Sequence, residues 1–226
     1  MSRPGEEFAV RVTDRSVALL TGMSYIRPMA TASKGGARAR LMKAADKLFY
    51  ERGINTVGVN EIVEVAGVAK TSLYLHFPSK DDLVAAYLAA RVAKYTAEWR
   101  EILDEAGDDS PERMLDAIFD EVADYVAMKN FNGCPFWKAA AEIGNPKHPA
   151  WGSLLEYRRY LRDEVFGAIA HRSDADDPDA LAEQFLLLYE AALAGAFVDR
   201  AGSAVERARA ASHCVMRNAP PAGRAA

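Results

Sequence analysis

The sequence predicts an all-α protein, and three observations support that prediction. Apolar residues recur at helical spacing through most of the chain beyond residue 40. Helix-ending glycines and capped, proline-containing helix starts separate these periodic stretches. No set of alternating segments could pair into a sheet of several strands. With 226 residues, of which 50% are hydrophobic and 27% charged, the composition is typical of a soluble globular protein.

The first predicted helices form a compact group. The first carries one apolar face and ends at Gly53; its face consists of Leu41, Ala44, Ala45, Leu48 and Phe49. A second short helix begins after Gly58 and reaches Gly67, whose freedom to adopt a left-handed conformation suits a sharp corner. A third follows, with Leu73 and Phe77 facing inward. This order predicts a helix-turn-helix, in which the helix after the corner reads DNA.

Longer helices are predicted downstream. Ser79, followed three residues later by Asp82, caps a helix that runs to about Ala106. The next begins at Ser110-Pro111 and stops near 130–133. Residues 131–151 mix Gly, Pro, Asn and aromatic residues, which predicts a short helix between turns.

Three more helices complete the prediction. Residues 154–170 are helical by their spacing. Asp177 and Pro178 begin a helix that reaches about Arg200. Ser203 and Glu206 then form a capping-box pattern for a last helix through Met216.

Charge is distributed unevenly along the chain. The net charge is -4, so the whole protein is not basic. The stretch from Lys34 to Lys80, however, contains eight basic and four acidic residues, whereas Asp81 to Ala226 contains sixteen basic and twenty-five acidic residues. The basic part coincides with the predicted helix-turn-helix, so a local phosphate-binding face is expected there.

Several other classes of protein lack support in the sequence. Two cysteines are too few for a disulfide framework, and no stretch approaches the roughly 18 consecutive apolar residues of a membrane span. The four histidines show no metal-ligand spacing, and neither a Walker loop nor a nucleophile elbow is present. We therefore expect a cytoplasmic protein that is not an enzyme and has no metal, no cofactor and no membrane partner.

The residues around the corner resemble the TetR family of bacterial transcription regulators. The resemblance covers about Arg38 to Leu88 and is carried mainly by Gly67-Val68 and by the run from Leu73 to Leu83, Leu-Tyr-Leu-His-Phe-Pro-Ser-Lys-Asp-Asp-Leu. The segment Gly133-Cys134-Pro135-Phe136 is similar to a C-terminal variant of that family.

The resemblance implies a homodimer whose two reading helices enter successive major grooves of a palindromic double-stranded operator. It also implies repression that a small-molecule effector relieves. The corresponding domains are a flexible tail (1–36), a helix-turn-helix domain (37–84), a helical effector-binding and dimerisation domain (85–218) and a flexible end (219–226).

The resemblance also assigns roles at the DNA. Tyr74, His76 and Lys80 match phosphate-holding positions, whereas Asn60, Lys70 and Thr71 match positions that reach bases or the nearby backbone. The expected DNA-binding set comprises Lys43, Lys47, Asn60, Lys70, Thr71, Ser72, Tyr74, Leu75, His76 and Lys80.

Three residues depart from the family pattern. Leu75 stands where the family often has a polar or aromatic residue, so a thymine-methyl contact is expected in its place. Val57 and Gly58 replace hydroxyl residues that often precede the second helix, which weakens the cap and removes one phosphate donor.

Aromatic residues and methionines in the downstream helices could surround an apolar cavity, although most such residues are simply core. The candidate set for an apolar or aromatic effector is Trp99, Phe119, Met128, Phe131, Cys134, Phe136, Trp137, Phe185 and Tyr189. Cys134 could instead be a reactive thiol, but no Lys or Arg lies within three residues of it, so a buried inert thiol is favoured.

The stretch from Phe185 to Val198 is apolar nearly all round, which requires burial on more than one side. A dimer seam and simple core packing both satisfy that requirement, and the seam is favoured. Its predicted residues are Leu188, Ala191, Ala192, Gly195, Val205 and Ala208.

One alternative function is an all-α small-molecule-binding or catalytic protein whose helix-turn-helix is only a packing element. That alternative predicts that Lys70, His76 and Lys80 do not share an exposed face.

Overall fold

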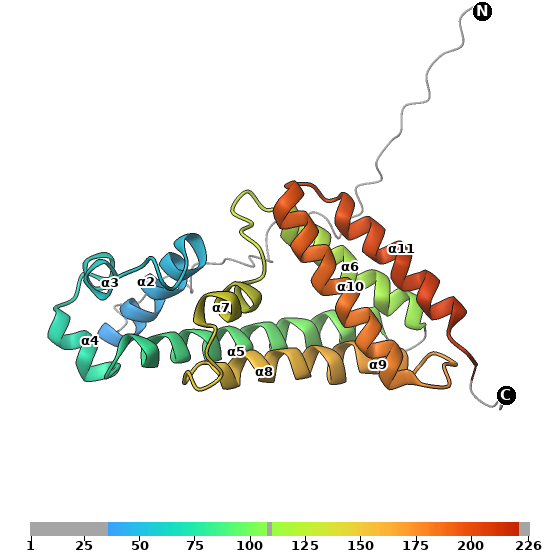
Figure 1. Ribbon diagram of the computed structural model, residues 1–226, viewed down its shortest axis with the longest axis horizontal. Helices are drawn as coiled ribbons and strands as arrows, with labels where there is room; N and C mark the ends of the chain where they lie inside the picture. The colour runs from blue at the N-terminus through green and yellow to red at the C-terminus, as the bar shows by residue number, and fades with distance from the viewer. Residues whose placement is uncertain (1–35, 108–109, 222–226) are drawn as a thin grey trace, which may run out of the picture. The chain divides into compact units, whose positions relative to one another are not determined.

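The computed structural model describes residues 36–107 and 110–221, which contain helices and no extended strand (Figure 1). The elements are α2 (Ala37–Arg52), α3 (Val59–Ala66), α4 (Lys70–His76), α5 (Lys80–Ala106), α6 (Pro111–Ala127), α7 (Pro135–Ile143), α8 (Trp151–Tyr160), the π-helical η1 (Leu161–Phe166), α9 (Gly167–Ala170), α10 (Pro178–Asp199) and α11 (Ser203–Asn218). The all-α prediction is confirmed. The flexible tail predicted for residues 1–36 lies outside the described residues except for Gly36, as do residues 222–226.

Three helices begin at the predicted side-chain caps. In each, the capping oxygen accepts a backbone N–H from three residues downstream, which satisfies one of the free donors at the helix start. The pairs are Ser79 with Asp82 at 3.1 Å, Ser110 with Arg113 at 3.3 Å and Asp177 with Ala180 at 2.9 Å.

The cap predicted for the last helix is wrong. Gly202 is the N-cap of α11 and Ser203 is already its first helical residue. The Ser203 hydroxyl accepts a bond from Nη2 of Arg207 at 2.7 Å, while the N–H of Glu206 bonds the carbonyl of Gly202. The sequence spacing of a capping box was present, but the backbone enters the helix one residue too early for Ser203 to use it.

The helix predicted for residues 154–170 begins earlier and contains a π-helical turn. It starts at Trp151 and passes through η1 without a break before α9 ends at Ala170. Such wider turns insert one residue into the helical repeat and change the face that later residues present.

The helix-turn-helix packs on α2 and on the start of α5. Side chains from four helices meet in a small core in which Leu41, Ile62, Leu73 and Leu83 have no exposed surface. The ring of Phe49 meets that of Tyr87 edge-on, with centroids 5.4 Å apart. The predicted domain boundary between residues 84 and 85 falls within α5, so one continuous helix serves both regions.

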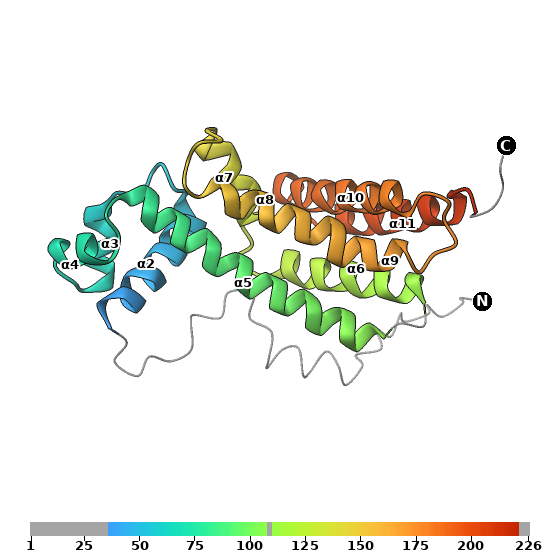
Figure 2. The same ribbon diagram turned by 90° about the horizontal axis from the view of Figure 1, so that it is seen from below.

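Beyond the helix-turn-helix, α5 packs against α6 and α8, and α10 packs against α11, α6, η1 and α9 (Figure 2). The large side chains of Trp99, Phe119, Phe166 and Phe185 fill this core and are almost wholly buried. Near the chain end, the N–H of Asp176 bonds the carbonyl of Pro220 at 2.7 Å, and Ala175 and Pro221 form an isolated bridge.

Candidate functional site

The corner between α3 and α4 has the geometry that the sequence predicts. Gly67 adopts the left-handed conformation, with φ 62° and ψ 42°. Its N–H bonds the carbonyl of Glu64 at 3.0 Å, and the N–H of Val68 bonds that of Val63 at 3.1 Å. These bonds satisfy the last carbonyls of α3 and turn the chain directly into α4.

One side of α4 is open to solvent. Leu73 is fully buried, and Thr71 and Leu75, which lie on the opposite side by helical spacing, are both exposed. Leu75 is 83% exposed and Tyr74 44% exposed. An exposed leucine in the last turn of a seven-residue helix adds nothing to the core, so this face is available for a contact outside the protomer.

Polar side chains surround Leu75 on α4. Lys70, Thr71 and His76 are exposed, and Ser72 is half-buried. The helix carries no acidic residue. Its exposed face therefore combines one cation, several hydrogen-bonding groups and an apolar centre.

Helix α2 and the start of α3 add further exposed polar groups. Lys43 and Lys47 lie on the solvent face of α2, and Asn60 lies in the first turn of α3. Arg38 was not among the predicted site residues, yet its guanidinium lies 5.3 Å from the ring centroid of Phe77, the residue that ends α4. Its place in the basic first helix was the available signal, but the contact with Phe77 depends on tertiary packing.

Lys80 differs from the other predicted contacts because its ammonium group already has a protein partner. The side chain is half-buried, and Nζ donates to the carbonyl of Ile54 at 2.6 Å. An ammonium group has three donors, so this bond leaves capacity for another acceptor. Lys70 and His76 share the exposed region of α4, whereas Lys80 also fastens the α2–α3 loop.

A cavity of about 530 Å³ lies between α7, α8 and α10. Of the predicted effector residues, Cys134, Phe136, Trp137 and Tyr189 line it. Trp99, Phe119 and Phe185 instead fill the core, and Met128 and Phe131 lie in the α6–α7 connection away from the lining. Lining residues that the prediction missed include Lys138, Trp151, Leu154, Leu155, Arg158, Leu161, Glu190 and Phe197.

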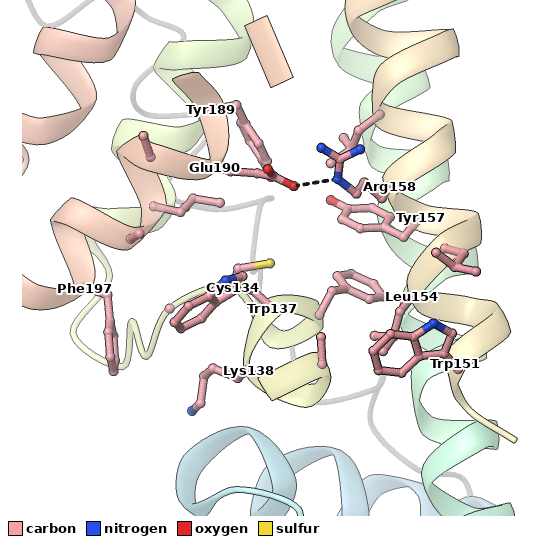
Figure 3. A pocket seen from close by; sticks show the side chains of 18 residues that line it. Cys134, Trp137, Lys138, Trp151, Leu154, Tyr157, Arg158, Tyr189, Glu190 and Phe197 are labelled. Carbon is pink, nitrogen blue, oxygen red and sulfur yellow. Dashed lines mark ion pairs between the residues drawn. The ribbon is translucent and has the colours of Figure 1, made fainter. Parts of the chain in front are cut away.

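The cavity wall is mostly apolar, with polar groups at defined places (Figure 3). The ring of Tyr157 stacks on Phe136 with centroids 3.9 Å apart, and its hydroxyl accepts a bond from Nε1 of Trp99 at 3.0 Å. Arg158 of α8 and Glu190 of α10 meet across the cavity, with Nε 3.3 Å from Oε1. Burial raises the pKa of Glu190, although Arg158 opposes that rise.

Cys134 is the N-cap residue of α7, and its thiol points into the cavity (Figure 3). Burial raises the pKa of this thiol, and the N–H groups of Trp137 and Phe136 offset only part of that rise. A protonated thiol is a poor nucleophile, so the environment agrees with the inert thiol expected from the sequence.

The segment that holds the cavity also binds the end of α2. The side-chain amide of Asn132 donates to the carbonyls of Tyr50 at 2.8 Å and Glu51 at 3.2 Å. Nζ of Lys138 donates to the same Tyr50 carbonyl at 2.9 Å. The last carbonyl groups of a helix have no N–H partner within that helix. At the end of α2, side chains from the cavity region donate the missing hydrogen bonds.

A second contact joins the end of α7 to the loop after α2. Glu142 accepts the N–H of Asn55 at 2.7 Å, and the Asn55 amide donates to the Glu142 carbonyl at 2.9 Å. Gly53 has φ 91°, and a Cβ atom at this position would lie 2.7 Å from Oε1 of Glu142. The glycine therefore permits both the turn and the close approach of α7.

Gly53→Ala is expected to lower the free energy of unfolding by about 1–2 kcal/mol, because alanine is strained at positive φ and its methyl group would displace Glu142. Denaturant unfolding followed by circular dichroism measures the change. Gly152→Ala is the matched control, since it lies in α8 with nothing within 4 Å of the added methyl group and should be neutral or slightly stabilising. Equal effects of the two substitutions would contradict the assigned role of Gly53.

The predicted dimer residues divide between the interior and the surface of the protomer. Ala192, Val205 and Ala208 are buried inside it. Gly195 is half-buried, and a Cβ atom there would lie 2.8 Å from Cβ of Ala204, so its small size serves the packing of α10 on α11 within one chain. Leu188 is half-buried and Ala191 is exposed.

Helix α10 is long and apolar enough to cross a membrane by length and composition, with a mean hydropathy of 1.4 over its most apolar window. Its inner face forms core contacts, and Leu187 and Val198 on the outer face are 52% and 77% exposed. A core helix that also has an uncovered apolar side gives the same signal as a membrane span.

Known proteins share both the sequence of the N-terminal helices and the arrangement of the helices described above. Residues 41–87 match the model of bacterial regulatory proteins of the tetR family. A TetR-family transcriptional regulator from Streptomyces coelicolor has a similar structure, with a TM-score of 0.73 and 28% identity over 80% of this chain and 95% of that one. A protein from Streptomyces avermitilis described as a tetR transcriptional regulator is 31% identical, with a TM-score of 0.68, over 79% of this chain and 99% of its own.

Sequence similarity to curated proteins covers between about a quarter and three quarters of the chain. The HTH-type transcriptional repressor KstR2 of Rhodococcus jostii is 37% identical over 73 residues, which are 32% of this chain and 36% of that relative. The chain thus spans about a third of the length of this curated relative. From the helix-turn-helix, the family match and the similarity over nearly the whole Streptomyces structures, the chain belongs to the TetR family of bacterial transcriptional regulators and is a regulator rather than an enzyme.

Proposed function

We propose that the protein is a homodimeric repressor that binds a palindromic operator and leaves it when a small, largely apolar or aromatic molecule enters the cavity. The observation that carries the proposal is the open face of α4, where Leu75 is 83% exposed between Lys70, Thr71 and His76. A short helix presented in this way fits the major groove. The relative KstR2 is named a repressor, which supports the direction of regulation.

Each side chain on this face has a role that its chemistry permits. Lys70 can contact a phosphate or a guanine, and Thr71 can bond a base or touch a thymine methyl group. Leu75 provides an apolar contact for a thymine methyl group. Tyr74 and His76 can bond phosphates at the groove edge, and Arg38 beside Phe77 adds a cation next to them.

Lys70→Ala is expected to weaken operator binding about tenfold, because one phosphate contact is lost. For the same reason the fall of log affinity with log salt concentration should become shallower, by about one unit of slope. Fluorescence anisotropy with a palindromic fragment from upstream of the gene, over a series of salt concentrations, measures both quantities. Lys129→Ala is the control, since Lys129 is exposed but lies beyond α6, outside the helix-turn-helix. Absence of salt-dependent DNA binding by the wild type would refute the proposed function.

The second copy is proposed to pack on the outer face of α10. Leu187, Ala191, Ala194 and Val198 lie on one side of this helix and are exposed. Ala191 and Ala194 also line the cavity, so the proposed seam borders the effector site. None carries a charge, and two are small enough to allow close approach of another helix. Such a stripe suits an isologous seam, in which the same surface of both copies is buried.

Effector binding is proposed to act through α7. Phe136, Trp137 and Ala140 of this helix line the cavity, while Lys138 and Glu142 of the same helix hold the end of α2 and its following loop. A ligand that shifts α7 changes these bonds and with them the seating of the helix-turn-helix. Differential affinity of the ligand for the two arrangements is what couples the sites. A screen of small molecules for release of the protein from its operator tests this step.

A further inference from the structure

The charged groups of the cavity indicate which kind of ligand it accepts. Among the described residues that line it, Lys138, Arg158 and Glu190 carry formal charges, so the lining is positive by one charge. The remaining surface consists mainly of aromatic and aliphatic side chains. Such a site favours a molecule with an apolar body and a negative group over one with a positive group.

Arg158 has the geometry of an anchor that can change partners. Its Nη2 donates to Oε1 of Glu183 at 2.8 Å, and Glu183 lies outside the cavity lining. Its Nε faces Glu190 at the longer distance of 3.3 Å. A guanidinium group has five N–H donors in one plane, so Arg158 can keep Glu183 while it bonds another carboxylate.

Glu190 is the weaker member of the bridge. It is half-buried in the wall of an apolar cavity, and that burial raises its pKa despite the neighbouring guanidinium. Figure 3 shows that the Arg158–Glu190 bridge joins α8 to α10 across the cavity. A ligand carboxylate that entered here would reach the guanidinium where Glu190 now bonds it.

We propose that the cavity binds an amphiphile with one carboxylate and an apolar aliphatic or aromatic body, and that this carboxylate replaces Glu190 as a partner of Arg158. The proposal rests on the proposed function in that this cavity is the effector site. The apolar body lies against Phe136, Trp137 and Leu154, and the exchange removes one of the two ion pairs that Arg158 makes with α10, because the pair with Glu183 is kept. Binding of the carboxylate to Arg158 thereby changes a contact between α8 and α10, which form two walls of the site.

Three probes with the same ten-carbon chain test the head group: decanoate, decanamide and decylamine. Isothermal titration of the full-length protein is expected to show decanoate binding at least about tenfold more tightly than decanamide, as expected for a hydrogen bond between charged groups. Decylamine is expected to bind no better than decanamide. Equal affinity for all three, preference for decylamine, or no binding of any probe to the folded protein would each overturn the proposal.

Two substitutions should act in opposite directions. Arg158→Gln is expected to abolish the preference for decanoate over decanamide, and Glu190→Gln is expected to strengthen decanoate binding because the competing carboxylate is gone. A cation-binding site would give the reverse result, with Glu190→Gln removing affinity for decylamine. Arg159→Gln is the matched control, since Arg159 is exposed on the same helix and does not line the cavity. Circular dichroism establishes that each variant is folded.

Operator binding, measured separately with and without decanoate, distinguishes the two proposals. Preference for decanoate without any effect on DNA binding would support the ligand class and contradict the effector role of the site. Operator binding by a protein that shows no head-group preference would support the proposed function and overturn the ligand class.

Discussion

Arg91→Met is expected to lower the free energy of unfolding by about 3 kcal/mol, because it removes a buried cation around which α2 and α5 are joined. Arg91 is only 5% exposed. Its Nε donates to Oδ1 of Asp46 on α2 at 2.9 Å, and Nη1 donates to the hydroxyl of Tyr95 at 2.9 Å. Methionine has a similar length, so the loss reports mainly on the charge and its bonds.

Aromatic rings complete the site of this cation. The guanidinium lies 4.9 Å from the ring centroid of Tyr50 and 5.2 Å from that of Tyr87. Burial raises the pKa of Tyr87 and Tyr95 above the ordinary tyrosine value, so both rings stay neutral at physiological pH. Asp46 therefore supplies a negative charge to Arg91 while the rings supply their π-faces.

Denaturant unfolding followed by tryptophan fluorescence measures the loss. Arg91→Lys should lie between the wild type and Arg91→Met, since lysine keeps the charge but cannot bond Asp46 and Tyr95 while stacking in a plane. Lys94→Met, three residues along the same helix and half-buried, is the matched control and should cost less. If Arg91→Met were as stable as the wild type, the cation would not be what joins α2 to α5.

The sequence predicted where α5 begins and about where it ends, but not the role of Arg91. Tyr87, Leu88, Val92 and Tyr95 are buried at helical spacing, and Arg91 lies on the same buried face. A charged residue at a core position is a visible signal in the sequence. Its partner Asp46 lies on another helix, 45 positions away, and only the packing of α2 on α5 brings the two together.

Local chemistry explains why some predictions succeeded and others did not. The caps at Ser79 and Ser110 and the corner at Gly67 depend on a few adjacent residues, and each formed as expected. The cavity depends on which side chains the core leaves uncovered. The aromatic candidates Trp99, Phe119 and Phe185 were taken up by the core, while residues of α8 that had not been candidates became part of the wall.

The double substitution Asn55→Ala with Asn132→Ala is expected to uncouple the cavity from the DNA. A compound found by its ability to release the wild-type protein should still bind the variant, but its effect on operator affinity should shrink about tenfold or more, within the usual range of coupling between sites. The reason is geometric. The side-chain amide of Asn132 bonds the carbonyls of Tyr50 and Glu51 at the end of α2, and that of Asn55 bonds the Glu142 carbonyl at the end of α7. Alanine removes these bonds and keeps the one from the Asn55 backbone N–H to Glu142.

The measurement is the ratio of operator affinities without and with saturating compound, for the wild type and the variant. Neither asparagine lines the cavity, so the affinity for the compound should remain close to that of the wild type. Asn218→Ala at the end of α11 is the control, and its ratio should not change. If the double variant were released as completely as the wild type, the two side-chain amides would not transmit the signal, and the Lys138–Tyr50 bond and the packing of α5 on both α2 and α8 would be the paths left between cavity and reading helix.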